Sequence, residues 1–127
     1  MPALERFTGT RIVALPRAID AAVWPDGTLA FRLAPDEVLV TPALNVTALD
    51  DPHAIVELET GFSAGWLDHV AAIDLLEREC DWELPQERPA FAQGIVAGLP
   101  VKVWFERDRV LFIVASPFAA DLMERLR

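Results

Sequence analysis

The strongest constraint on the fold is a series of apolar strands in the last third of the chain. The stretch from Val110 to Val114 is apolar at every position, which is typical of a central strand buried on both faces. Ser116 and Pro117 then predict a closing helix, with the serine hydroxyl as N-cap and the proline at the first helical position. Tight turns are predicted between three strands, at 91–97, 101–106 and 109–115.

The middle of the chain changes its period from two to that of a helix. Residues 54–59 alternate as a strand. From Ser63 to about Cys80, apolar side chains recur on one helical face, which predicts an amphipathic helix with Ser63 as N-cap. Residues 54–127 therefore predict an α+β fold, a ferredoxin-like β-α-β-β-β-α unit with helices on one side of a mostly antiparallel sheet. The predicted helical stripe consists of Trp66, Val70, Ile73 and Cys80.

Turn residues interrupt the first third of the chain at short intervals. Prolines, glycine and aspartates separate short β-rich runs, so residues 1–41 are predicted to form an antiparallel β-meander. Residues 42–52 are too short for a domain linker and are interpreted as a loop. The length of 127 residues fits one domain spanning 1–127. The predicted strands lie at 11–15, 19–24, 29–33 and 37–40.

Charge and cysteine content exclude several classes of partner. The chain carries 11 basic and 20 acidic residues, a net charge of −9. This field opposes binding to nucleic acids and to anionic membrane surfaces. The single Cys80 cannot form an intrachain disulfide, and no apolar run approaches the roughly 20 residues of a membrane helix. The N-terminal residues lack the pattern of a signal peptide, so the expected location is the cytoplasm.

The candidate nucleophiles and metal ligands form no recognisable catalytic pattern. His53 and His69 lack the spacing of a metal site, and His69 is expected at a helix surface. Acidic neighbours of Cys80 raise a thiol pKa, which opposes a nucleophilic role. Ser63 and Ser116 both lie where helix caps belong. No catalytic residue, metal ligand or cofactor held by this chain is predicted.

Two carboxylates on the strand at 54–59 carry the remaining catalytic alternative. Glu57 and Glu59 share one strand face, where paired carboxylates could transfer protons or hold a cation. A solvated sheet face or a subunit rim explains the same pattern and is the favoured interpretation.

Three apolar residues are the candidate interface positions. Trp104 is out of phase with the buried residues of its strand and faces the other side of the sheet. Trp82 follows the predicted helix in an acidic loop, and Leu75 points away from the helical stripe. Aromatic side chains of this kind are enriched at protein interfaces. An opposite sheet face that is covered within the domain remains the alternative.

Several segments resemble a known family of accessory subunits. Residues 33–40, Leu-Ala-Pro-Asp-Glu-Val-Leu-Val, resemble a strand start of the sarcosine oxidase gamma-subunit family, which is related to the folate-binding domain of aminomethyltransferases. Gly-Leu-Pro-Val at 98–101 and Ser-Pro-Phe-Ala-Ala-Asp-Leu at 116–122 are similar to that family's last strands and closing helix. The resemblance covers roughly residues 29–127.

The resemblance implies a non-catalytic subunit of a hetero-oligomer. In such complexes the flavins, the nicotinamide dinucleotide and the folate site belong mainly to larger subunits, and the gamma chain supports their assembly. Any flavin or folate would then lie in partner subunits. The alternative is a stand-alone α+β module that self-associates or binds a small ligand.

Overall fold

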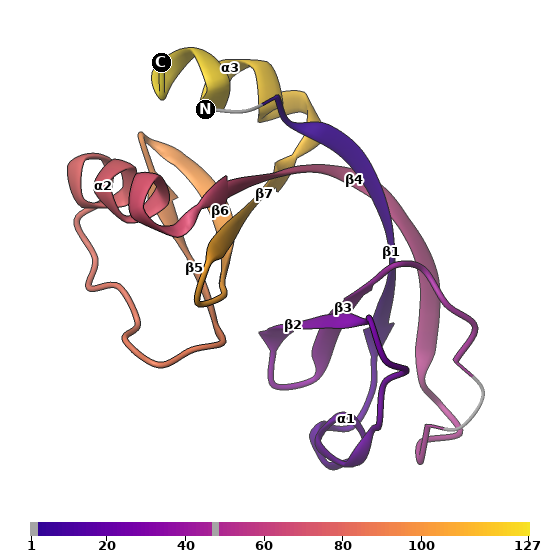
Figure 1. Ribbon diagram of the computed structural model, residues 1–127. Helices are drawn as coiled ribbons and strands as arrows, with labels where there is room; N and C mark the ends of the chain where they lie inside the picture. Colours follow the sequence, from indigo (N-terminus) through magenta and orange to yellow (C-terminus); the bar gives the residue numbers. More distant parts are fainter. Residues whose placement is uncertain (1–2, 47–48) are drawn as a thin grey trace. The chain divides into compact units, whose positions relative to one another are not determined.

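The computed structural model describes residues 3–46 and 49–127, and strand predominates over helix (Figure 1). About 45 % of the chain is strand and 22 % is helix. None of the helices in the described part of the chain has the length and apolar character that crossing a membrane requires. The elements are β1 (Glu5–Val13), α1 (Pro16–Ala21), β2 (Leu29–Ala34), β3 (Glu37–Thr41), β4 (Ile55–Asp68), α2 (His69–Glu79), β5 (Ala90–Val96), β6 (Leu99–Phe105), β7 (Arg109–Ala115), the 3₁₀ helix η1 (Ser116–Phe118) and α3 (Ala119–Arg125).

The strand order shows that the predicted ferredoxin-like fold is wrong. The seven strands follow the order β2-β3-β1-β4-β7-β6-β5 in one hydrogen-bonded sheet. The N-terminal strands belong to this sheet in the order β2-β3-β1, which is not the predicted meander, because β1 lies beside β3 and not beside β2. The physical reason is β4, which has 14 residues and therefore extends well beyond its pairing with β7. On its other edge β4 lies next to β1, so β1 connects β2 and β3 to the rest of the sheet.

The chain divides into two compact units. Unit 1 comprises the described residues of Met1–Arg6 together with Gly61–Arg127, and unit 2 comprises the described residues of Phe7–Thr60. β1 and β4 each contribute residues to both units.

Unit 1 has a core built from alternating strand residues and two helices. Val103 and Phe105 of β6 and Phe112 of β7 are fully buried, because these positions share one sheet face. Leu76 of α2 and Leu122 of α3 are also fully buried and belong to the same cluster. Burial of aromatic and aliphatic side chains is the main source of stability for such a unit.

The predicted helix from Ser63 to Cys80 is wrong in its first part. Residues 62–68 are strand, paired antiparallel with 115–109 of β7, and α2 starts only at His69. The N-cap is Asp68, whose carboxylate accepts a hydrogen bond from the Ala71 amide at 3.1 Å. Val70, expected in the buried stripe, is exposed. Pairing with β7, which is distant in sequence, outweighs the local helical spacing.

The closing helix begins differently from the prediction. Residues 116–118 form η1, and α3 follows without a side-chain cap. The hydroxyls of Ser116 and Ser63 lie 2.8 Å apart and hydrogen bond to each other. Both serines, predicted as N-caps, therefore bond across unit 1 between η1 and β4.

Unit 2 contains a helix where a strand was predicted. The run at 19–24 is not a strand, because α1 occupies Pro16–Ala21 with the proline in its first turn, where a missing N–H costs nothing. Ala18 and Ile19 of this helix are buried, and Ile19 belongs to one cluster with Ile12 of β1 and with Val38 and Val40 of β3. β3 pairs antiparallel with β2 on one side and β1 on the other.

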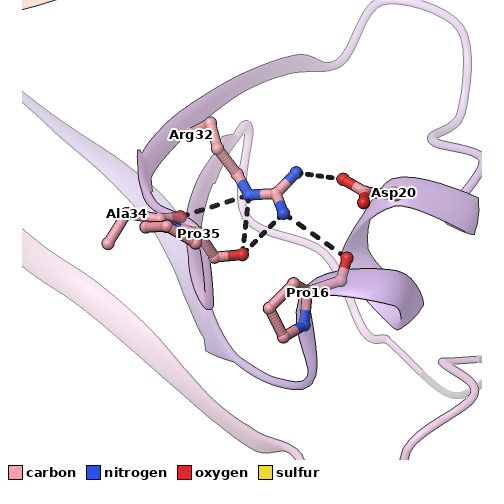
Figure 2. A network of polar contacts seen from close by, with 5 residues as sticks. All are labelled: Pro16, Asp20, Arg32, Ala34 and Pro35. Atoms are coloured by element: carbon pink, nitrogen blue, oxygen red, sulfur yellow. Dashed lines mark hydrogen bonds and ion pairs between the residues drawn. The ribbon is translucent and has the colours of Figure 1, made fainter.

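One arginine fastens α1 to the β2–β3 turn. Figure 2 shows the Arg32 guanidinium between Asp20 of α1 and the turn carbonyls. Its Nη1 donates to the Asp20 carboxylate at 2.7 Å, and its Nε donates to the carbonyls of Ala34 and Pro35 at 3.1 Å each. Nη2 donates to Pro35 at 2.5 Å and Pro16 at 3.4 Å. The fixed fork of donors on arginine suits this many acceptors.

Candidate functional site

The first residues of β4 form the most unusual surface of unit 2. Ile55, Val56 and Leu58 have 54 %, 41 % and 68 % of their surface exposed, although all are large and apolar. Because strand side chains alternate, Val56 and Leu58 share one face, and Ile55 shares the other with Glu57. Residues 55–58 thus expose apolar side chains on both faces. Exposed apolar side chains gathered on one short segment make it a candidate interaction site.

The 55–58 segment also lies at a strand edge. β7 pairs with β4 only over residues 62–68, and the last partner, Ala115, ends β7. In the strand order that starts at β2, β4 is the last strand with described residues in unit 2, because the next strand, β7, lies in unit 1. An edge strand offers backbone N–H and C=O groups to an incoming strand.

Asp51 positions the start of this strand. Its carboxylate accepts hydrogen bonds from the backbone N–H groups of Leu15 and His53, both at 2.9 Å. These two bonds, that from Leu15 first, lower the pKa of the Asp51 carboxyl. The Ala54 amide in turn donates to the Asp51 carbonyl at 3.2 Å. This turn ties the start of the 55–58 segment to Leu15, the residue that precedes α1.

Acid is expected to weaken the Asp51 turn. A carboxyl whose pKa is lowered by folding stabilises the folded state when the pH is above its pKa in the unfolded chain, about 3.9. This stabilisation is lost as the pH falls through the lower pKa of the folded state. Asp51→Asn should therefore show a smaller drop in urea midpoint between pH 7 and pH 3 than the wild type. The matched control is Asp50→Asn, at an exposed neighbouring carboxylate, which should keep the wild-type difference. An Asp51→Asn profile identical to wild type contradicts this role.

A cleft of about 330 Å³ borders the 55–58 segment. Its wall is held by Thr10, whose hydroxyl donates to the Leu44 carbonyl at 3.1 Å and accepts from the Leu44 amide at 3.0 Å. Thr10 is buried, so this loop is fixed against β1. The cleft is lined by Thr10, Ala43, Leu44, Asn45, Val56, Glu57 and Leu58.

A larger cleft of about 680 Å³ lies in unit 1 beside α2 and the loop that follows it. Arg88 holds this loop, because its Nη1 donates to the Pro85 and Glu87 carbonyls at 2.7 Å each. Its Nε donates to His69 Nε2 at 3.3 Å, and its guanidinium lies 4.9 Å from the centre of the Phe105 ring. The cleft is lined by His69, Ile73, Leu76, Glu77, Cys80, Asp81, Trp82, Glu83, Leu84, Pro85, Gln86 and Arg88.

Cys80 lines this cleft, and its surroundings keep the thiol protonated. Burial raises the pKa of Cys80, and the nearby Asp81 carboxylate raises it further. The protonated sulfur donates to the Leu76 carbonyl at 2.9 Å. A thiol that is held in its protonated form is a poor nucleophile at neutral pH.

The three predicted interface residues occupy different environments. Leu75 is buried in the core of unit 1, with 5 % of its surface exposed, and offers no surface to a partner. Trp82 packs against that core, and its Nε1 donates to the Ile95 carbonyl at 3.0 Å. Trp104 is half-buried on the β6 face opposite the core, and its Nε1 donates to Glu106 at 2.9 Å. The structure does not bring these residues together.

Glu106 links Trp104 to β7. Burial alone would raise its pKa, but the hydrogen bonds from Arg109 and Trp104 outweigh that effect and the pKa is lowered. Arg109 donates to Glu106 at 2.8 Å and places its guanidinium 3.6 Å from the centre of the Trp66 ring. These contacts orient the aromatic side chains within unit 1.

The other chemical candidates are dispersed. His53 is exposed in unit 2, whereas His69 contacts Arg88 in unit 1. Glu57 is exposed on β4, where Glu59 is half-buried. Among the described residues, no group of three or more His, Cys, Asp or Glu side chains could hold a metal ion.

The exposed apolar residues of β4 are what sequence reasoning missed. Alternation predicted the strand, but apolar residues at 55, 56 and 58 are ordinarily expected to be buried. The only local signal is that the apolar residues do not keep to one face, as they would on a half-buried strand. No protein-family profile, curated protein or solved structure matches the chain.

Proposed function

We propose that this chain is a non-catalytic accessory subunit that binds a larger protein through the 55–58 segment. The observation that carries the proposal is the exposure of Ile55, Val56 and Leu58 at a strand edge. Burying such side chains in an interface gains about 1.5–3 kcal/mol per fully buried side chain. The role resembles that of the gamma subunit of heterotetrameric sarcosine oxidase-like complexes, and a cytoplasmic location belongs to the same proposal.

The proposal assigns cofactors to the partner. The thiol of Cys80 is protonated, and Ser63 and Ser116 bond to each other, so these groups have structural roles in unit 1. Flavin and folate, if the complex is of the sarcosine oxidase type, then belong to the larger subunits.

Native isolation of the tagged full-length chain from its host tests the proposal. Leu58→Lys puts a charge in the apolar interface, so we expect at least a tenfold loss of the co-isolated protein. The matched control is Val70→Lys, because Val70 is also apolar and highly exposed but lies on α2, outside the 55–58 segment. This variant should retain the co-isolated protein. Absorbance of the eluate near 450 nm reports a flavin in the complex. Equal recovery with Leu58→Lys and wild type contradicts the proposal.

The cleft beside α2 favours a second candidate, a small-ligand-binding module. Its volume of about 680 Å³ is within the range of small-molecule sites, and Ile73, Leu76 and Leu84 supply apolar lining. A fragment library screened by amide chemical shifts of the full-length chain tests it. Shifts that cluster on 69–88 support this function, and a screen without such shifts removes it.

A further inference from the structure

Resting on the proposed accessory role, we propose that the 55–58 segment binds an extended basic segment of its partner as an added β-strand. That partner strand carries a lysine or arginine opposite Glu57, flanked by apolar residues. The occupant is a different protein and not a second copy of this chain.

The strand edge supplies the backbone part of this recognition. Residues 55–58 have strand geometry but lie outside the pairing between β4 and β7. Added strands gain affinity from main-chain hydrogen bonds and gain specificity from alternate side chains. The start of the segment is tied by the Asp51 turn, so the edge is ordered before a partner arrives.

The side chains of the segment set the pattern of the partner strand. Val56 and Leu58 lie on one face, and together with Glu57 they border the cleft that Leu44 also lines. Apolar side chains of an incoming strand meet them there, because directly paired residues point to the same face. The cleft of about 330 Å³ gives those side chains room beside the strand.

Charge selects a basic partner. Glu57 is exposed, and within the described residues its carboxylate forms no ion pair or hydrogen bond. A cation directly across the strand pair stabilises the pairing, and a like charge destabilises it. The net charge of −9 further attracts a basic segment over longer distances.

The same charge argument disfavours a second copy. Residues 50–60 contain no lysine or arginine, so no register of this strand against its own copy places one opposite Glu57. Antiparallel pairing centred on Glu57 puts the two Glu57 side chains opposite each other. Pairing centred on Leu58 puts Glu57 opposite Glu59 twice. Both arrangements place like charges together.

Two synthetic peptides test the proposal on the full-length chain. One is a heptapeptide of alternating valine and threonine with a lysine at the central position, and the other carries glutamate at that position. We expect the lysine peptide to shift the amide signals of 55–58 and to bind at least fivefold more tightly. Glu57→Lys should reverse this preference, whereas Glu5→Lys, at an exposed position in unit 1, should leave it unchanged. Equal binding of both peptides, or shifts that avoid 55–58, overturns the proposal.

The two proposals fail separately. A partner that is lost with Leu58→Lys, combined with peptides that do not discriminate, retains the accessory role and removes the added basic strand. If the peptides discriminate but native isolation yields no partner, the added basic strand is retained and the accessory role is removed. Sedimentation of the purified chain tests the remaining occupant, since a dimer abolished by Leu58→Lys identifies a second copy and overturns the choice of a different protein.

Discussion

Phe112→Ala should destabilise the chain by about 3–5 kcal/mol, the usual cost of removing a fully buried aromatic ring. Phe112 has no exposed surface and belongs to the unit 1 core, which also contains buried residues of β6, α2 and α3. The fixed neighbours cannot fill the space left by the ring, so most of the cavity should remain. Urea unfolding followed by tryptophan fluorescence measures the change, because three of the four tryptophans, Trp66, Trp82 and Trp104, lie in unit 1.

The matched control is a phenylalanine that is exposed in the same unit. Phe118 of η1 has 42 % of its surface exposed, so Phe118→Ala should cost less than about 1 kcal/mol. Similar losses for the two variants contradict the placement of Phe112 in the core.

Gly9→Ala should destabilise unit 2 by about 1–3 kcal/mol, the range for overpacked sites. A Cβ at this buried position of β1 would lie 2.7 Å from the Val40 carbonyl oxygen and 3.0 Å from Leu39 Cδ1. The oxygen belongs to the backbone of β3, so relief requires the paired strands to shift. Elsewhere in a strand the same substitution gains roughly 0.5–1 kcal/mol, which makes the sign of the effect informative.

Urea unfolding followed by circular dichroism measures the effect of Gly9→Ala. Thr8→Ala, at the exposed neighbouring residue, should change the stability by less than about 1 kcal/mol. An unchanged or higher midpoint for Gly9→Ala would show that β1 and β3 are not in close contact at this point.

Strands with a strong local pattern could be predicted from sequence. The strand predicted at 109–115 is confirmed as β7, and that at 29–33 corresponds to β2 with one further residue. In both cases the turn residues and the apolar pattern are local properties, so they act in the same way whatever the rest of the fold. The strand predicted at 37–40 is likewise confirmed within β3.

Elements decided by distant pairing could not be predicted. Trp66 and Val70 have helical spacing, yet Trp66 pairs with Leu111 of β7 in a strand and Val70 lies exposed at the start of α2. Trp66 and Val70 would also share one face of a strand, because they lie an even number of positions apart. Only the pairing with β7 selects the strand at Trp66. The strand order, and with it the fold class, depends on such pairings.

The candidate site was predicted only in part. Glu57 was identified as an exposed strand carboxylate, and the structure places it on the exposed part of β4. The exposure of Val56 and Leu58 was missed, because its only local sign is that the apolar residues do not keep to one face, and the end of the pairing with β7 at residue 62 depends on distant sequence. Leu75 was misplaced because the predicted stripe was defined with Trp66, which lies in β4, and Val70, which is exposed. The buried residues of α2 are Ala72, Leu75 and Leu76.

Site-specific photocross-linking in the native host tests whether a partner protein binds the 55–58 segment. A photoreactive benzophenone amino acid at position 58 would contact whatever binds the 55–58 segment, and the same amino acid at position 23, which has 93 % of its surface exposed in unit 2, is the control. We expect one discrete cross-linked protein at position 58 that is absent at position 23. No adduct at position 58, or the same adducts at both positions, would contradict it.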